Sequence, residues 1–289
     1  MKAIDIHVHP PTNPATVTEQ STQTTRQMRE YFRRTEPDLT TPEEYAEFFE
    51  ERDIVAVLLP TDSRLKDSNE PNPNDWVGEI YRRYPKRFIP FCSVNPNRGS
   101  QAIDDLNSAV NENGAKGIKF LPTGQDFFAN DRQYYKLWER AQDLNLVIIT
   151  HSGHNGVGSG TPGGGGRKQN YSNPIWWDDV AADFPELKII LAHPAWPWFD
   201  EQVSMLVHKS NVYMDISGWS PWYFPADLIR EMQTRLQNKV LFGSDFQALH
   251  VDRWFRDWAD LDIDEAVQSK IFVDNAKAVL SNVDWENYS

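Results

Sequence analysis

Two histidines near the start of the chain, His7 and His9, stand two residues apart within the segment IDIHVHP. Residues two apart in a β-strand point to the same side, so both imidazoles could bind one ion. Asp5 shares that side by the same alternation and is a possible hydrogen-bonding partner. Imidazole is a strong ligand for zinc and similar ions. A His-x-His pair is common by chance, so its meaning depends on which other residues accompany it.

Three further residues of this kind each close an apolar run. His151 follows LVIIT, His193 follows KIILA, and Asp245 ends FGSD. Histidine and aspartate are poor core residues unless they are paired. Their repeated position at the ends of apolar runs therefore predicts a single polar cluster.

The elements that must position these residues alternate regularly. Apolar or β-branched runs are predicted as strands over 3–8, 54–59, 88–94, 117–121, 146–150, 188–192, 212–216 and 240–243. Between them, helical patterns begin with the capping box Thr41-Pro42-Glu43-Glu44 and continue over 75–84, 100–111, 131–144, 174–184, 199–209, 225–236 and 264–280. Eight strand-helix units in this length predict an α/β fold, a (β/α)₈ TIM barrel, in one domain over 1–289. An open doubly wound sheet is the alternative, but no Gly-rich turn follows the first strand.

Two segments interrupt this rhythm. Residues 10–40 are rich in Thr and Pro, with one short helix expected around 26–34, and residues 152–172 hold eight of the fifteen glycines. Both follow strands that end in histidine. Long loops at such places are lids, oligomer contacts or plain surface insertions.

The motifs IDIHVHP, KGIKF, THSG, LAHP and FGSDF follow one another on successive predicted strands. In this combination the chain resembles the amidohydrolase superfamily, in its second amidohydrolase subfamily. That group includes aminocarboxymuconate-semialdehyde decarboxylase, aromatic-acid decarboxylases and uncharacterised metal-dependent hydrolases. The resemblance implies a barrel that holds one divalent metal ion, most often Zn²⁺, with Mn²⁺ as the alternative.

By matching position, the resemblance implies that His7, His9, His151 and Asp245 are the metal ligands. His193 would contact the metal-bound water or the substrate, and Asp245 would also serve as the general base. Two-metal relatives carry a carboxylated lysine on the fourth strand, where this chain has Lys119. We expect a mononuclear site, with Lys119 as a substrate carboxylate contact or a structural cation.

Residues for substrate binding are expected on the loops around this site. Arg64 and Lys119 could hold a substrate carboxylate by paired hydrogen bonds. Trp196 and Trp219 stand in two aromatic runs that follow the sixth and seventh strands. Such runs could form an apolar wall beside the metal for a small planar, aromatic or lactone substrate.

Three functions are compatible with these residues. The first is a metal-dependent hydrolase in which an activated water attacks an amide, ester or lactone carbonyl. The second is a non-oxidative decarboxylase of an aromatic or unsaturated acid on the same site, favoured by the characterised short relatives. The third is a metal-binding barrel without catalysis, which the full set of ligand positions argues against.

Composition limits the partners. The chain has 289 residues, 39% hydrophobic, and a net charge of −13. That charge repels nucleic acid and anionic membranes, so we expect neither as a partner. No secretory segment is recognisable at the N-terminus, which predicts a cytoplasmic protein. The resemblance suggests a homodimer, with residues 10–40 as the contact.

Overall fold

Parallel strands form the inner wall of this computed structural model, which describes residues 1–66 and 68–288. In those residues the strands are β1 (Ala3–Val8), β2 (Ile54–Leu58), β3 (Phe88–Pro90), β4 (Gly117–Phe120), β5 (Val147–His151), β6 (Lys188–Ala192), β7 (Val212–Asp215) and β8 (Val240–Leu241). β1, β2 and β3 pair in sequence order, as do β4 to β8, and every pairing is parallel. The strands therefore begin and end on common sides.

Backbone hydrogen bonds join the two groups of strands at both seams. On one side, the amide of Cys92 donates to the carbonyl of Gly117. On the other, the amide of Ile6 donates to Phe242, and the amide of Asp245 donates to His7. The ring is therefore closed, and the predicted (β/α)₈ barrel is confirmed in place of the open sheet.

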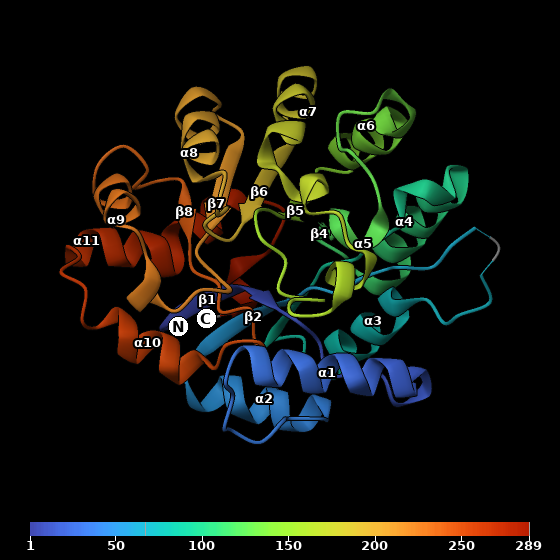
Figure 1. Ribbon diagram of the computed structural model, residues 1–289, viewed down its shortest axis with the longest axis horizontal. Coiled ribbons are helices and arrows are strands. Elements are labelled where there is room, and N and C mark those ends of the chain that lie inside the picture. Colours follow the sequence, from blue (N-terminus) through green and yellow to red (C-terminus); the bar gives the residue numbers. More distant parts are fainter. Residues whose placement is uncertain (67, 289) are drawn as a thin grey trace.

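Helices surround this ring (Figure 1). They are α1 (Glu19–Tyr31), α2 (Pro42–Glu51), α3 (Pro73–Arg83), α4 (Ser100–Asn113), α5 (Pro122–Gln125), α6 (Tyr135–Asp143), α7 (Asp178–Asp183), α8 (Phe199–His208), α9 (Ala226–Gln233), α10 (Val251–Trp258), α11 (Glu265–Ser269) and α12 (Asn275–Val279). The predicted capping box is present: the Thr41 side chain accepts from the Glu44 amide, and the Glu44 carboxylate accepts from the Thr41 amide. In the described part of the chain, no helix is long and apolar enough to cross a membrane.

Two apolar layers hold the barrel together. An inner cluster fills the ring, with Ile4, Val57, Ile149 and Ile190 among its members. A larger outer cluster lies between the strands and the helices. Residues of α12 and both ends of the chain pack against the inner cluster, so they close the end of the barrel opposite the strand carboxyl ends. The open end is left for the polar side chains.

Several helices differ from the expectation: α5 was not predicted, and the helix predicted over 264–280 is divided into α11, a π-helical turn over Lys270–Asp274 and α12. The helix in the first insertion runs over Glu19–Tyr31, earlier than the predicted 26–34, and most of its residues are exposed. With little apolar periodicity, its boundaries could not be predicted from burial. The helix Val251–Trp258 was not predicted, although its buried Val251, Trp254 and Trp258 have helical spacing. The side chain of His250 caps it by accepting from the Asp252 amide.

A bulge in β1 changes the expected alternation. Asp5 pairs with Ala56 and Val8 pairs with Leu58, so β1 contains one more residue than β2 between these two pairs. The buried Asp5 carboxylate accepts hydrogen bonds from the His7 amide and from the amide and hydroxyl of Ser244. Asp5 thus connects the bulge to the segment after β8. The strand alternation had suggested Asp5 as a hydrogen-bonding partner of the imidazoles, but its described hydrogen bonds go to the His7 amide and to Ser244.

Candidate metal centre

The predicted site residues come from the carboxyl ends of different strands. His7 lies in β1 with His9 just beyond it, Lys119 lies in β4, and His151 ends β5. His193 follows β6, and Asp245 follows β8. Because all strands run in the same direction, these ends meet at one mouth of the barrel, where this fold carries its active sites.

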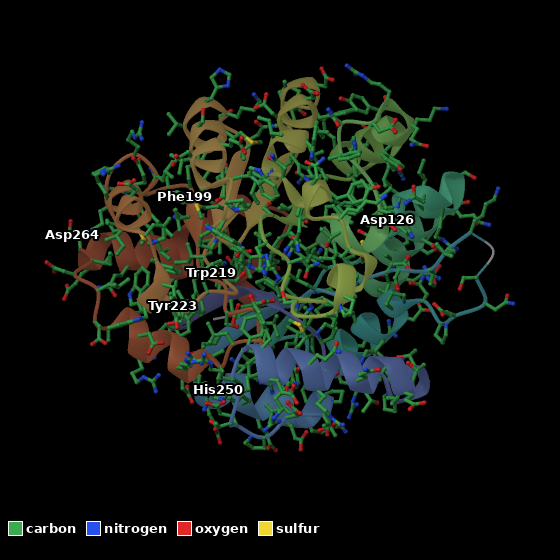
Figure 2. All side chains as sticks on the ribbon, viewed as in Figure 1. Asp126, Phe199, Trp219, Tyr223, His250 and Asp264 are labelled. Carbon is green, nitrogen blue, oxygen red and sulfur yellow. The ribbon has the colours of Figure 1, made fainter. Side chains whose placement is uncertain are left out.

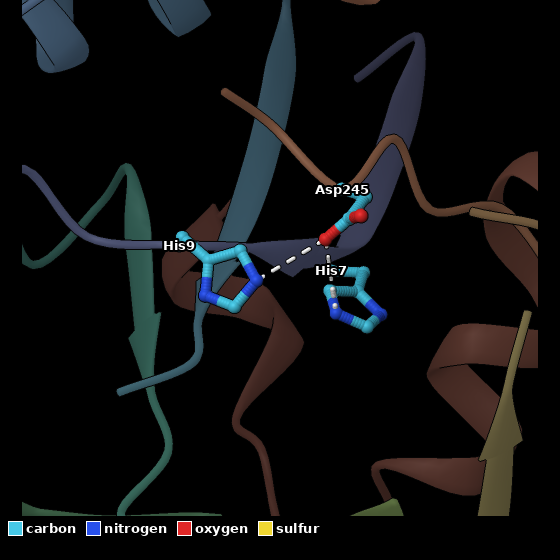
Figure 3. A group of neighbouring side chains, drawn as sticks. All are labelled: His7, His9 and Asp245. Atoms are coloured by element: carbon cyan, nitrogen blue, oxygen red, sulfur yellow. Dashed lines mark ion pairs between the residues drawn. The ribbon is translucent and has the colours of Figure 1, made fainter. Parts of the chain in front are cut away.

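Three of the four predicted ligands converge directly. Donor atoms of His7, His9 and Asp245 all lie within 4.8 Å of one another. Asp245 Oδ1 is 3.1 Å from His9 Nε2 and 3.4 Å from His7 Nε2 (Figure 3). Two tetrahedral ligands with zinc bonds of about 2.0–2.2 Å lie roughly 3.3–3.6 Å apart. The donor types and their spacing therefore fit a divalent ion.

The fourth predicted ligand joins this group through His193. His151 Nδ1 lies 3.1 Å from His193 Nε2, and the two ring centroids are 4.7 Å apart. The His193 ring in turn lies 4.8 Å from the His7 ring. The other nitrogen of His151, Nε2, is 3.3 Å from the carbonyl oxygen of His154. The imidazoles of His7, His193 and His151 thus form one continuous row.

A buried carboxylate lies behind this row. Asp215, the last residue of β7, has no exposed surface, and its Oδ2 is 3.0 Å from His7 Nδ1. Its Oδ1 accepts from the amides of His193 and Ser217, at 3.1 and 3.0 Å. Asp215 lies at the end of the apolar run over 212–216, so its place at a strand end makes it a second carboxylate candidate. Ser217 was not predicted, although it stands two residues after Asp215, the same spacing that drew attention to His7 and His9.

Burial sets the protonation of these groups. Desolvation lowers the pKa of His7 to about 3, with nearby Lys119 acting in the same direction. Burial also lowers the pKa of His151 and of His193. Burial alone would raise the pKa of Asp215 and of Asp245, but hydrogen bonds from the histidines, and the charge these carry once they are protonated at low pH, outweigh it and hold both pKa values below the usual one. The site therefore combines neutral imidazoles with ionised carboxylates, the forms that bind metal ions.

Two site residues have unusual backbone conformations. His193 has a φ of 71° and Asp245 a φ of 66°, in the left-handed region that residues with a Cβ rarely adopt. Each such residue costs of order 1–3 kcal/mol and persists only where its surroundings impose it, often at functional sites. Gly218, with a φ of 71°, lies against this region: a Cβ there would be 2.7 Å from His193 Nδ1.

Lys119 is buried among the site residues. Its Nζ is 2.9 Å from His7 Nε2. Burial lowers the pKa of Lys119 to about 8, although the charges of Asp245 and Asp215 act to raise it. Both roles predicted for Lys119, a cation near aspartates and a contact for a substrate carboxylate, stay predictions.

The other predicted substrate contacts have different surroundings, and their roles stay predictions. Arg64 donates to Asp62 Oδ1 and Asp105 Oδ2, each at 2.9 Å, so it serves a buried ion-pair network. Trp196 is 57% exposed, and its ring centroid lies 5.7 Å from that of His154. Trp219 is partly buried and packs against the outer apolar cluster, nearer the barrel centre than Phe199 in Figure 2.

A cavity of about 230 Å³ opens beside His9. Leu59 and Trp76 line it together with five prolines, and its polar lining consists of threonines and asparagines. The Trp76 indole is fixed by a 2.7 Å hydrogen bond from Nε1 to the carbonyl of Pro11. No Lys, Arg, Asp or Glu belongs to this described lining, so the cavity suits an uncharged portion of a ligand.

A closed barrel with histidines and an aspartate at its strand carboxyl ends defines a class of metal-dependent enzyme folds. The amidohydrolase family model matches residues 4–281, and the chain therefore belongs to the amidohydrolase family. This confirms the resemblance seen in the sequence. No curated protein sequence matches the chain.

Solved structures share the fold at low identity. A TIM-barrel protein from Bordetella bronchiseptica is 23% identical over 96% of this chain and 98% of its own, with a TM-score of 0.77. A dihydroxybenzoic acid decarboxylase from Polaromonas sp. JS666, with bound manganese and the inhibitor 2-nitroresorcinol, is 19% identical over 99% and 98%, with a TM-score of 0.72. A probable 2-pyrone-4,6-dicarboxylic acid hydrolase from Acinetobacter baumannii, with citric acid bound, is 15% identical over 97% and 100%, with a TM-score of 0.62.

Proposed function

We propose that this protein is a metal-dependent hydrolase that acts on a small aromatic, lactone or carboxylate-bearing substrate. The observation that carries the proposal is the convergence of His7, His9 and Asp245 within 4.8 Å at the barrel mouth. We assign these three residues and His151 as the ligands of one divalent ion. Three imidazoles and one carboxylate favour Zn²⁺. Mn²⁺ is the alternative, because the Polaromonas decarboxylase is described with manganese.

In the proposed hydrolysis, Asp245 and His193 have different roles. When bound, a divalent ion supplies a nucleophile by lowering the pKa of water toward ~7 and polarises the substrate carbonyl. Asp245 is ionised at neutral pH and takes the proton of the attacking water as general base. His193, whose Nε2 faces the row of imidazoles, orients that water or stabilises charge on the oxygen formed.

The cavity beside His9 offers a place for the substrate. His9 belongs both to the group of donor atoms and to the cavity lining, so a molecule held there would lie next to the site. Leu59 and the prolines supply apolar walls, and Trp76 supplies a flat aromatic surface. These walls support a small planar substrate. Lys119 remains the proposed contact for a carboxylate, since Arg64 is engaged by two aspartates.

Decarboxylation on the same site is the second candidate. Its support is the fold shared with decarboxylases of dihydroxybenzoic acid and of 5-carboxyvanillate, both with bound manganese. The same ligands would serve, with the reaction ending in protonation of a ring carbon in place of attack by water. The two activities differ in product, since only decarboxylation releases CO₂.

One experiment tests both candidates. The purified protein is analysed for bound metals, stripped with a chelator, and reloaded with Zn²⁺ or Mn²⁺. Each form is then given small lactones, amides and aromatic acids, while ring-opened or hydrolysed product and CO₂ are measured separately. We expect activity to disappear on stripping and to return with one ion per chain. Equal turnover by the stripped protein would contradict both candidates.

Two further expectations stay predictions: the protein acts in the cytoplasm, and it forms a homodimer. Exposed apolar side chains in the first insertion support the second of these. Val17 and Tyr31 are 56% and 47% exposed.

A further inference from the structure

One hydroxyl group lies between the two imidazoles that matter most to the proposed reaction. Ser217 Oγ is 3.0 Å from His7 Nδ1 and 2.9 Å from His193 Nδ1. The same hydroxyl donates to Asp215 Oδ1 at 2.5 Å. Donor atoms of His7, His193 and Asp215 also lie within 4.8 Å of one another, but the Ser217 hydroxyl contacts all three. This buried group is therefore a hydrogen-bond centre and not a second cation site.

The partners of His7 determine which nitrogen carries its proton. At Nδ1, the Asp215 carboxylate is 3.0 Å away, and an ionised carboxylate can only accept. At Nε2, the Lys119 ammonium is 2.9 Å away and can only donate. Both contacts require the proton on Nδ1 and a lone pair on Nε2. The lone pair of His7 is thus on Nε2, the nitrogen that lies 3.4 Å from Asp245 Oδ1.

The partners of His193 determine the position of its proton in the same way. Its Nδ1 is 3.0 Å from the carbonyl oxygen of Ser217, which can only accept. The proton is therefore on Nδ1, and Nε2 carries the lone pair. His151 Nδ1 lies 3.1 Å from that lone pair, and His151 Nε2 lies 3.3 Å from the His154 carbonyl oxygen, which can only accept.

We propose that Asp215 and Ser217 are positioning residues that fix His7 and His193 in the same tautomer, with the proton on Nδ1 of each. Asp215 acts on His7 through its carboxylate, and Ser217 acts on His193 through its carbonyl and hydroxyl. The proposal rests on the proposed function for its catalytic meaning. The geometry itself involves only residues of this chain.

The tautomer decides between the two roles open to His193. A neutral imidazole with a lone pair on Nε2 accepts a hydrogen bond from water but cannot donate one to an anionic oxygen. His193 therefore begins the reaction as an acceptor that orients the attacking water. Asp215 and Ser217 also lie where they can stabilise the positive charge if Nε2 takes up a proton, as an aspartate does behind the histidine of a Ser-His-Asp triad.

Nitrogen NMR of the metal-free protein tests the proposal without any substrate. Histidine is labelled with ¹⁵N, and long-range ¹H–¹⁵N spectra distinguish the protonated from the bare ring nitrogen. Comparison with His7→Gln and His193→Gln assigns the signals. We expect a bare Nε2 on both rings in the wild-type protein. A proton on Nε2 of either ring would overturn the proposal.

Two variants extend the test, with zinc affinity measured by competition with a chelator. Asp215→Asn should allow His7 to move its proton to Nε2 and should weaken zinc binding 10- to 100-fold, the usual effect of removing a partner of a ligand. Ser217→Ala keeps an acceptor for each Nδ1, the Asp215 carboxylate for His7 and the carbonyl of residue 217 for His193, so it should retain both tautomers and lose less zinc affinity than Asp215→Asn. Ser172→Ala is the control, because its buried hydroxyl has no hydrogen-bond partner in the described structure.

The outcomes separate this proposal from the proposed function. Unchanged tautomer and zinc affinity in Asp215→Asn would refute the positioning role, even in an active enzyme. The predicted tautomers in a protein that turns over no substrate would keep the positioning role and count against the enzymatic one. If Asp215→Asn does not fold, the wild-type spectrum decides, because a proton on Nε2 of His7 or of His193 overturns the proposal by itself.

Discussion

At the residue scale, replacing His193 distinguishes a role in orienting water from a role as a metal ligand. If it orients water, His193→Ala should keep the metal and lose about 10²- to 10⁴-fold in kcat, the usual contribution of such a group. Metal content, melting temperature and rate are measured on the same preparation. Loss of metal together with activity would instead make His193 a ligand, and retained activity with a lower melting temperature would make it a packing residue.

Replacing the proposed ligands tests the assignment of the metal site. His7→Ala and His9→Ala each remove one of three converging donors, so we expect most of the bound metal to be lost after dialysis. Elemental analysis measures the remaining ion per chain. His208→Ala is the matched control, since that histidine is exposed at the end of α8. Full occupancy in both ligand variants would show the assignment to be wrong.

The buried imidazoles also predict how the stability of the metal-free protein depends on pH. Burial lowers the pKa of His7 from 6.5 to about 3, and it lowers the pKa of His151 and His193 as well. Below pH 6.5 these histidines bind protons in the unfolded chain but stay neutral in the folded chain. The free energy of unfolding is therefore highest above pH 6.5 and decreases towards pH 3. Asp5, whose pKa burial raises to about 7, acts in the opposite direction but is one group against three.

Calorimetry on chelator-treated protein checks this from pH 7 down to pH 4. We expect the melting temperature to fall throughout that range. A melting temperature that stays level or rises on acidification would contradict the idea that these histidines are neutral in the folded protein.

At the scale of elements, the segment after β7 must pass close to His193. Gly218→Ala would place a Cβ 2.7 Å from His193 Nδ1 at a φ of 71°, so it combines a steric clash with backbone strain. Gly160→Ala is the matched control: its φ is 77°, but no atom lies within 4 Å of the added Cβ. We expect the control to lose about 1 kcal/mol and Gly218→Ala to lose clearly more. Equal losses measured by denaturant unfolding would exclude the clash.

The sequence predicted the elements better than their details. Strands such as Lys188–Ala192 were predictable because buried parallel strands are continuous apolar runs bounded by polar residues. The bulge in β1 was not predictable, since it depends on Asp5 meeting Ser244, a residue 239 positions away. The histidines proposed as ligands could be singled out in the sequence by their position at strand ends. Ser217 was missed because a single serine carries no signal until the fold brings His7 and His193 against it.

At the scale of the whole molecule, the prediction concerns assembly. We expect a homodimer at micromolar concentration, with the insertion over residues 10–40 in the contact. Val17→Asp should then shift the mass measured by light scattering towards the monomer, because Val17 is an exposed apolar residue of that insertion. Trp222→Asp is the control, since Trp222 is 75% exposed in the segment after β7. A monomeric wild-type protein would contradict the prediction.

The seam between β1 and the segment after β8 has a consequence for the order of events in the cell. His7 and His9 leave the ribosome well before Asp245, which lies more than 230 residues further along the chain. Until Asp245 donates its amide hydrogen bond to His7, the proposed ion has no complete set of ligands. Metal uptake should therefore follow synthesis of the chain, and nascent chains that end before β8 should exchange zinc freely with the surrounding pool.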